Sequence, residues 1–574
     1  MRRFLPVAVS AAGFALVLSG CSTNPVTDAS NNVSFTSCST VDCAGTLPSG
    51  AVFDIIMPQD WNGTLAIYSH GLAAERPLAD VPAPSATPQP TISDSPGGEA
   101  TRSEGNKPTG KDASESPQPE AERSGSAQPE DGGTEIQPRP GGPELAPLWG
   151  EGDRALADVM LQAGYAIAGA RPPEPGWAVP EQMKAAEELH QYFSDNVATP
   201  NRVYVWGEST GGLASALLAE QHPEWVSGAV AMCAPLSGPI DSFNLSLDVA
   251  YAVRELLAPD LELVAYGSAE EAQRARQIAM SAIRKAADGS PTMQAKIAFI
   301  AGIGELPNVS TTETGTTWES QIAANAEAIG HLIEQNTVQR EVVERRVAGN
   351  FSGNGGTDYA LRISEEQRIQ LEEVKAGLAD KFLRELGAGV RITPDPQAVD
   401  RATAMGTLGP DLQVPTLTLH NIFDPVYIAQ NVSSFEQVLS GGEPESAAKL
   451  VTAFMTPPST YSEYNPATEG VGNCQFEPRT MLGAMIQLNQ WVRNGTYPGR
   501  DTSRQSFKSP SVTLDYDPGP WPQMSATPQV APSPQQNAAA ARMRLRGRDG
   551  PSQGDPQQPS GLRRPHSQSD RGTR

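Results

Sequence analysis

Histidine and cysteine are scarce in this chain of 574 residues, which has six of the former and five of the latter. Five cysteines are too few for a disulfide scaffold. Neither a C-x-x-C nor an H-E-x-x-H motif occurs, so we expect no metal and no other cofactor. Beyond the N-terminus no run of about 18 apolar residues exists, which argues against a membrane-spanning helix. With 66 acidic and 42 basic residues the net charge is −24, which argues against nucleic acid as a partner.

The first residues have the pattern of an export signal. Arg2 and Arg3 precede an apolar stretch at positions 4–18 that is too short to span a bilayer comfortably. The stretch ends in Leu-Ser-Gly-Cys, which looks like the lipobox of bacterial lipoproteins, whose cysteine is acylated. We predict a lipoprotein signal peptide over 1–21, lipid attachment to a membrane at Cys21, and a location in the bacterial cell envelope. Residues 22–32 would be a polar tether. The alternative is an ordinary signal peptide with a chance cysteine.

Export would permit disulfide bonds. Without Cys21 four cysteines remain, and four cysteines allow three pairings. Cys38 and Cys43 are close enough in the sequence to close a local loop, whereas Cys233 and Cys474 are far apart. Of the three pairings we choose Cys38 with Cys43 and Cys233 with Cys474. The alternative is that Cys233 and Cys474 are buried free thiols.

Two regions lack the composition of folded protein. Residues 77–147 hold 14 Pro, 9 Gly and 8 Ser but no Phe, Trp or Tyr, and they carry 12 acidic and 5 basic residues. Such a segment buries too little apolar surface to offset its loss of chain entropy, so we predict a disordered insert. Residues 502–574 are again rich in Pro, Gln and Ser and predict a disordered tail. Because insert, tail and signal region cancel in charge, the remaining body keeps the net charge of −24.

The remaining body alternates between apolar strand-like runs and helical spacing. This alternation predicts an α/β fold with a mostly parallel sheet and helices on both faces. We assign 22–76, 148–243 and 412–501 to this core. Residues 244–411 have helical spacing and predict a helical cap inserted into the core. The expected strands are 51–57, 63–69, 165–170, 202–206, 226–233 and 414–419, and the expected core helices are 155–163, 183–196, 211–220 and 478–493.

A serine motif lies at the junction of one expected strand and one expected helix. Gly207-Glu208-Ser209-Thr210-Gly211 has the form G-x-S-x-G, follows the strand at 202–206 and opens the helix at 211–220. This is the context of a nucleophile elbow, a strained turn that pushes a serine hydroxyl into a cleft. The motif therefore predicts Ser209 as a nucleophile. The alternative is a tight turn without chemistry.

Two further strand ends are suited to assist such a serine. His70 and Gly71 follow the strand at 63–69, where backbone N–H groups commonly form an oxyanion hole. The expected donors are the N–H groups of Thr210 and of about Leu72, and His70 itself is expected to be structural. Asp424 follows the strand at 414–419, where the acid of a Ser-His-acid triad would lie. The alternative for Asp424 is a turn-forming aspartate before a proline.

With these motifs the chain resembles the α/β-hydrolase superfamily, in particular secreted bacterial hydrolases of the esterase or peptidase type. The resemblance covers about 45–76 and 148–500. It implies a serine hydrolase acting on carboxylic ester or peptide bonds of a small-molecule substrate. The matching stretches are Trp61-Asn-Gly-Thr-Leu, Ser69-His-Gly, Gly164-Tyr-Ala-Ile-Ala-Gly, Gly176-Trp-Ala-Val, Gly207-Glu-Ser-Thr-Gly-Gly, the loop of Asp424, and Gly472-Asn-Cys-Gln-Phe.

The last of these stretches departs from the family pattern. Relatives carry Gly-His-Cys-x-Phe there, and the His is the general base, whereas this chain has Asn473. An amide has no useful basicity near neutral pH, so Asn473 is expected to hold Asp424 by a hydrogen bond without accepting a proton. Removing the His of such a triad costs about 10⁶ in turnover and leaves about 10³–10⁴ over water. Activity is therefore predicted to be absent or very weak.

Three hypotheses remain open. The first is a protein with the architecture of a serine hydrolase whose activity is absent or very weak because of Asn473. The second is a non-catalytic surface lipoprotein that binds a small ligand or a partner in the retained pocket. The third is a working hydrolase with a replacement base, for which His420 is the first candidate and His331, in the expected cap, the second.

Overall fold

The computed structural model describes residues 27–28, 33–38, 42–71, 153–457, 470–499, 507 and 511–522. The predicted signal peptide with Cys21, the predicted insert and most of the predicted tail lie outside these residues.

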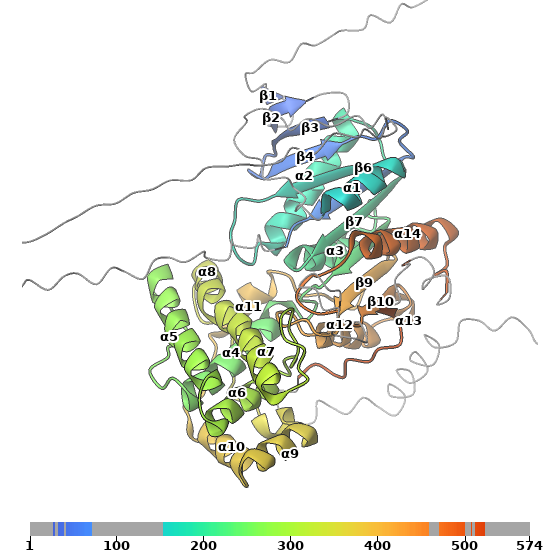
Figure 1. Ribbon diagram of the computed structural model, residues 1–574. Coiled ribbons are helices and arrows are strands. Elements are labelled where there is room, and N and C mark those ends of the chain that lie inside the picture. Colours follow the sequence, from blue (N-terminus) through green and yellow to red (C-terminus); the bar gives the residue numbers. More distant parts are fainter. Residues whose placement is uncertain are drawn as a thin grey trace, which may run out of the picture. The chain divides into compact units, whose positions relative to one another are not determined.

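The centre of the fold is a mixed sheet with the strand order β1-β2-β3-β4-β6-β5-β7-β8-β9-β10-β11 (Figure 1). The strands from β6 to β10 in this order run parallel, while β1 to β4 and β11 are attached antiparallel. The mostly parallel sheet predicted from the sequence is confirmed. The strands are β1 (Thr27–Asp28), β2 (Val33–Cys38), β3 (Asp42–Thr46), β4 (Val52–Ile56), β5 (Thr64–Ser69), β6 (Tyr165–Arg171), β7 (Arg202–Glu208), β8 (Gly228–Met232), β9 (Thr416–Asn421), β10 (Leu450–Met455) and β11 (Val512–Thr513).

Helices cover both faces of the sheet (Figure 1). On one face α2, α3 and α12 contribute side chains such as Leu189, Leu217 and Phe435 to a buried cluster. On the other face α1 and α14 contribute Met160 and Leu488 to a second cluster. The helices of the core are α1 (Asp153–Gln162), α2 (Val179–Asn196), α3 (Thr210–Gln221), α12 (Gln430–Ser440), α13 (Pro444–Ala447) and α14 (Pro478–Asn494).

Strand β7 shows why the centre of this sheet could be read from the sequence. Val203 and Val205 point into the cluster beneath α2 and α3, whereas Tyr204 and Trp206 point into the cluster beneath α1 and α14. Successive side chains of a strand alternate between its faces, so a strand buried on both faces needs an apolar residue at each position. β7 is therefore a rigid base for the turn that carries Ser209.

The chain between β8 and β9 forms a helical cap with its own buried cluster, which includes Tyr251, Phe299 and Phe382. α4 begins at Gly238, before the predicted boundary at 244, because Pro239 suits the first turn of a helix. The elements of the cap are α4 (Gly238–Leu256), α5 (Ala269–Ala287), α6 (Pro291–Ile303), α7 (Trp318–Glu334), the π-helix η1 (Gln335–Gln339), α8 (Arg340–Val347), the 3₁₀-helix η2 (Tyr359–Arg362), α9 (Glu365–Val374), α10 (Leu378–Ala388) and α11 (Pro396–Thr403).

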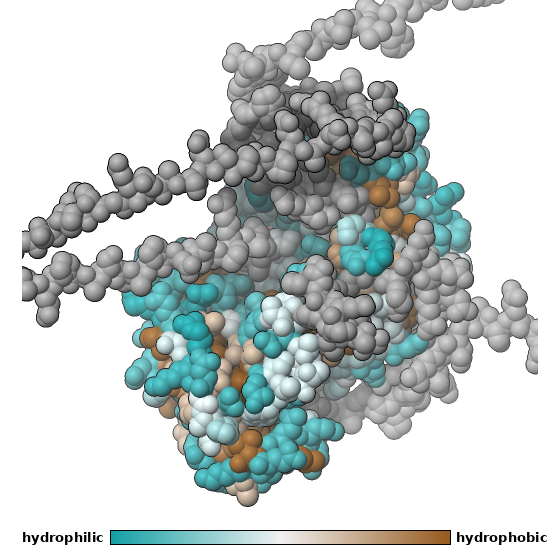
Figure 2. Space-filling model, viewed as in Figure 1, coloured by the Kyte–Doolittle hydropathy of each residue, from teal (hydrophilic) through white to brown (hydrophobic). Residues whose placement is uncertain are grey.

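Polar side chains fix the cap against the core. Arg346 of α8 donates from Nη1 to the carbonyl of Trp177 at 2.7 Å and pairs through Nη2 with Glu181 of α2 at 2.5 Å. Gln430 of α12 donates from Nε2 to Glu305 at 3.1 Å. The outward surface of the cap in Figure 2 is mainly hydrophilic, with apolar residues in small separate groups. Of the helices in the described ranges, none combines the length and the apolar character needed to span a membrane.

Two short strands lie in the predicted tether and in the predicted tail. β1 lies inside the predicted tether and pairs with β2, and β11 lies inside the predicted tail and pairs with β10. Within the range predicted as tail, residues 511–522 are described and pack on the folded part. Val512 is buried, Tyr516 packs edge-on against a phenylalanine of β10, and Trp521 packs against the cap cluster. A composition averaged over 502–574 conceals these anchors. We call residues 511–522 the strap.

The predicted local disulfide has a suitable backbone position. Cys38 and Cys43 are directly opposite partners in the β2–β3 hairpin. Directly opposed residues of an antiparallel pair have Cα atoms about 4.5–5.5 Å apart, which is within the range of a disulfide. The side chain of Cys38 lies outside what the structure describes, so this pairing stays a prediction.

Candidate active site

Ser209 occupies the sharp turn between β7 and α3. Its backbone has φ 54° and ψ −127°, a conformation that is strained for a residue with a β-carbon. The amide of Ser209 donates to the carbonyl of Met232 at 2.9 Å, which ties the turn to the end of β8. The strand, the strained turn and the helix that a nucleophile elbow requires are thus all present.

The glycines on either side of Ser209 are needed because another backbone passes close by. A β-carbon on Gly211 would collide with the carbonyl oxygens of Ser69 and His70. A β-carbon on Gly207 would collide with the same Ser69 oxygen and with the backbone of Gly211. The end of β5 therefore lies directly against the turn, as the small residues of the motif predict.

Of the two predicted oxyanion-hole donors, Thr210 and Leu72, the structure describes Thr210. Thr210 is the first residue of α3, so its N–H has no carbonyl acceptor within the helix. From the opposite side, a β-carbon built on Gly71 would lie 3.0 Å from the β-carbon of Ser209. Leu72 follows directly but lies outside the described residues, so its role as the second donor stays a prediction.

His70 is engaged in the support of this region. The Nε2 of Gln182 donates to the backbone carbonyl of His70 at 2.7 Å, and the imidazole packs edge-on against Tyr68 at 4.9 Å between ring centres. Burial, together with the charge of Arg171, lowers the pKa of His70 to about 4. The ring is therefore neutral at ordinary pH.

Asp424 lies in the loop after β9 with a side chain that is 1% exposed. Its Oδ1 accepts hydrogen bonds from the amides of Val426 and Tyr427 at 2.8 and 2.9 Å. Its Oδ2 accepts a hydrogen bond from the Nδ2 of Asn473 at 2.9 Å. Burial raises the pKa of Asp424 to about 7, and these three hydrogen bonds oppose the rise only in part. Among the described residues no imidazolium balances the buried charge, as it would in a complete triad.

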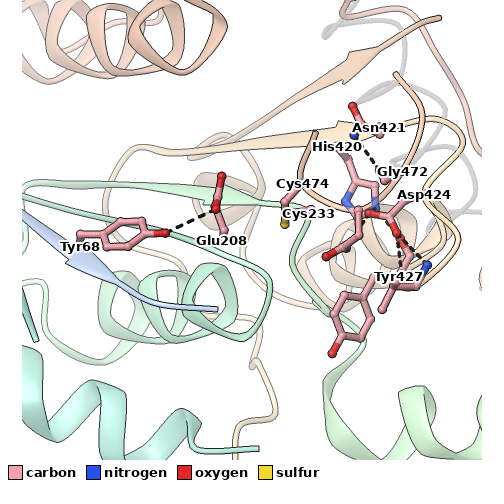
Figure 3. The surroundings of a disulfide bond; sticks show 11 residues. Tyr68, Glu208, Cys233, His420, Asn421, Asp424, Tyr427, Gly472 and Cys474 are labelled. Carbon is pink, nitrogen blue, oxygen red and sulfur yellow. Dashed lines mark hydrogen bonds and ion pairs between the residues drawn. A yellow bond between two sulfur atoms is a disulfide. The ribbon is translucent and has the colours of Figure 1, made fainter. Parts of the chain in front are cut away.

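The loop that carries Asn473 is held on several sides (Figure 3). Cys474 is bonded to Cys233 at the end of β8, with 5.4 Å between the Cα atoms, so the long-range disulfide predicted from the sequence is present. Asn421 donates from Nδ2 to the carbonyl of Gly472 at 2.8 Å and accepts from the amide of Gly470 at 2.9 Å. These contacts bring the amide of Asn473 to the carboxyl group of Asp424.

His420 is buried in β9 (Figure 3). Its hydrogen bond is to the loop after β9 that carries Asp424, which we call the acid loop. Its Nε2 lies 2.6 Å from the carbonyl oxygen of Tyr427, and because a carbonyl can only accept, this nitrogen carries the proton. The distance from Nε2 to the Oδ2 of Asp424 is 3.8 Å, too long for a direct hydrogen bond. Burial lowers the pKa of His420 to about 4. In the described part of the chain no hydrogen bond joins His420 to Ser209.

Tyr427 is a site residue that reasoning from the sequence missed. Its side chain is 3% exposed and forms a hydrogen bond with the side chain of Ser209. Burial raises the pKa of Tyr427; the bond to Ser209 opposes this rise, and the nearby Asp424 adds to it. The phenol is therefore a neutral partner of Ser209 and not a base. The signal in the sequence was the spacing of Asp424 and Tyr427. An aspartate that accepts hydrogen bonds from the amides two and three residues further on turns the chain back.

The other described histidines lie away from the site. Within the described residues, none of them forms a hydrogen bond with Ser209 or Asp424. Among these same residues no group of three or more His, Cys, Asp or Glu could hold a metal ion. The histidines concerned are His190 on α2, stacked on Trp225, His222 after α3, paired with Glu187, and His331 on α7, whereas His566 lies outside the described residues.

The topology, the nucleophile elbow and the chain order of Ser209, Asp424 and Asn473 define an α/β-hydrolase fold. No protein-family model and no curated protein matches the chain. Among solved structures it is similar to feruloyl esterase B from Aspergillus oryzae, at 12% identity and a TM-score of 0.35 over 83% of this chain and 86% of that one.

Two further solved structures show likenesses of the same order. One is an esterase from Aspergillus oryzae, at 11% identity and a TM-score of 0.33 over 81% of this chain and 82% of that one. The other is Candida antarctica lipase A in its closed state, at 11% identity and a TM-score of 0.29 over 91% of this chain and 89% of that one. Likenesses of this size say nothing about which bond, if any, this chain cleaves.

Proposed function

We propose that this protein is an exported lipoprotein of serine-hydrolase architecture whose Ser209 site has lost efficient turnover of ester or peptide bonds and binds a small ligand. The observation that carries the proposal is the hydrogen bond from the Nδ2 of Asn473 to the Oδ2 of Asp424. A proton donor without basicity occupies the position where a general base would connect the acid to the nucleophile.

The magnitude of the missing step supports the loss of turnover. A serine hydroxyl is a weak nucleophile until a base takes its proton. Without the histidine of a triad, turnover falls by about 10⁶, and only about 10³–10⁴ over water remains from the oxyanion hole and binding. The partner that Ser209 has instead is the phenol of Tyr427, which burial keeps neutral.

His420 offers little support for the alternative of an active hydrolase. Its protonated Nε2 is committed to the carbonyl of Tyr427, and burial holds its pKa at about 4. A base with so low a pKa has little driving force to take a proton from Ser209 near neutral pH. The alternative would require the loop after β9 to rearrange.

The test uses the exported protein from residue 22 onward. We expect no turnover above background of p-nitrophenyl butyrate or of an aminoacyl p-nitroanilide, and no phosphonylation of Ser209 by a fluorophosphonate. The matched control is Ser209→Ala, which should be indistinguishable from the unmodified protein in these assays. Turnover that disappears in Ser209→Ala would contradict the loss of activity and revive the alternative with His420 as base.

The anchor is tested separately in a bacterial host. Growth with an alkyne-labelled fatty acid should label the protein, and Cys21→Ala should abolish both the label and the recovery of the protein with membranes. Labelling that persists in Cys21→Ala, or an unlabelled protein in the medium, would refute the lipid anchor while leaving the interpretation of the Ser209 site untouched.

A further inference from the structure

A cavity of about 290 Å³ lies on the side of the acid loop where the cap and the strap meet. α6, α7 and α9 supply its cap side, the loop from 422 to 430 its core side, and Tyr516 comes from the strap. Ser209 is not among the residues that line it. The volume is at the lower end of the range for small-molecule sites, so the cavity would hold a small ligand.

Amide side chains supply most of the polar groups in the wall of this cavity. Several of them already use one end in the fold: Gln321 donates to the carbonyl of Gly315 at 3.0 Å, and Asn325 donates to that of Pro307 at 3.1 Å. Their side-chain oxygens remain as acceptors. The amide side chains of the wall are Asn308, Gln321, Asn325, Gln367, Gln370 and Gln430.

In two of these amides both the NH₂ group and the oxygen are available to bind a ligand. Neither the side chain of Asn308 nor that of Gln370 forms a hydrogen bond with another residue in the described part of the chain. Each amide offers two N–H donors and an acceptor oxygen. A complementary ligand therefore carries groups that donate and accept at the same atom, as hydroxyl groups do.

The charges of the wall favour a neutral ligand. Within the part of the chain that the structure describes, no Lys, Arg or His lines the cavity, so an anion would meet no counter-charge there. Two carboxyl groups, Glu305 and Asp424, are present. Burial raises the pKa of both, and they already accept hydrogen bonds from Gln430 and Asn473, respectively. The charge of Arg362 also acts on Glu305, which disfavours a cation beside it.

Aromatic side chains complete the wall on the side of the core. Phe423 of the acid loop and Tyr516 of the strap both line the cavity, and the ring of Tyr516 is 37% exposed. Its edge is fixed against the ring of Phe454 at 5.1 Å between centres. A ligand with hydroxyl groups around its edge and an apolar face would satisfy both the amides and these rings.

We propose that this cavity binds one ring of a neutral saccharide. The amides of Asn308 and Gln370 bind its hydroxyl groups, and the rings of Phe423 and Tyr516 cover its apolar face. The cavity shares Asp424 with the Ser209 centre but is not lined by Ser209, so this inference does not depend on whether Ser209 turns over a substrate.

The test is titration of the exported protein with glucose, galactose, mannose and N-acetylglucosamine and with the disaccharides maltose, cellobiose and chitobiose, followed by ligand-observed NMR and calorimetry. We expect saturable binding of at least one of them. The double variant Asn308→Ala/Gln370→Ala should weaken it by about tenfold or more, because each lost hydrogen bond is worth about 1 kcal/mol.

Two controls separate the outcomes. Gln277→Ala removes an exposed amide of α5 outside the cavity and should leave binding unchanged. Ser209→Ala should also leave it unchanged, so a failure of the hydrolase interpretation would not affect the result. Binding of no sugar in the panel, binding undiminished in the double variant, or tighter binding of the neutral peptide triglycine would each overturn the proposal.

Discussion

The substitution Asn473→His is the sharpest probe of the Ser209 site. In both side chains the δ-nitrogen is three bonds from Cα, so the Nδ1–H of a histidine can take over the bond that the Nδ2 of Asn473 makes to Asp424 at 2.9 Å. The Nε2 then lies on the far side of the ring, as in a triad. The loop itself is held by the disulfide of Cys474, which the substitution does not touch.

The expected gain is a large share of what a triad histidine contributes. We expect the kcat/KM for p-nitrophenyl butyrate to rise by at least about 10³, out of the roughly 10⁶ that the histidine of a triad is worth. The gain falls short because the phenol of Tyr427 already holds the hydroxyl of Ser209. Adding Tyr427→Phe in the Asn473→His background should therefore raise the rate further, by about tenfold for one competing hydrogen bond.

The pH profile and the controls distinguish a restored base from an incidental effect. The rate of the Asn473→His variant should rise with pH through the pKa of the new imidazole, near 7, because only the neutral ring accepts the proton. Asn473→Gln keeps an amide and should stay inactive, and Ser209→Ala should abolish every gain. A soluble Asn473→His protein with unchanged thermal unfolding and no activity that depends on Ser209 would show that the triad assignment is wrong.

Three other predictions concern stability and are measured by urea unfolding. Burial raises the pKa of Asp424 from 3.8 to about 7, so the stability gained from its protonated form is complete below pH 3.8 and is lost as the pH rises through 7; Asp424→Asn should lose this dependence, and an unchanged profile would contradict it. Cys233→Ser should cost about 2–5 kcal/mol, since the bond to Cys474 spans 241 residues; no loss under oxidising conditions would refute this. Gly211→Ala should cost at least about 3 kcal/mol through its backbone collision, whereas Gly356→Ala, with nothing within 4 Å of the added carbon, should be near neutral.

The centre of the fold could be predicted because its strands are buried on both faces. β7 has an unbroken apolar run from Val203 to Trp206, and all residues of β9 are buried. The elbow could be predicted because its glycines stand where a β-carbon would collide with the backbone at the end of β5. β10 was not among the expected strands, although five of its six residues are apolar.

The strap and Tyr427 could not be predicted, for a different reason. The strap depends on two aromatic side chains, Tyr516 and Trp521, within a region whose average composition is that of an unfolded chain. Tyr427 reaches Ser209 because the carboxyl group of Asp424 binds its amide and sets the direction of the loop. The strap depends on tertiary contacts that no local pattern records, whereas the spacing of Asp424 and Tyr427 indicates a turn but not its approach to Ser209.

The two protonation states of Asp424 explain how the fold accepts an asparagine in place of a base. With a pKa of about 7, the buried carboxyl group is charged in some molecules and protonated in others near neutral pH. An asparagine can serve both forms, because its Nδ2 donates to a carboxylate and, after a flip of the amide, its oxygen accepts from a carboxylic acid. A histidine with a protonated Nδ1 only donates toward the acid. Asn473 therefore satisfies the buried acid without a cation, and in doing so it removes the base that Ser209 would need.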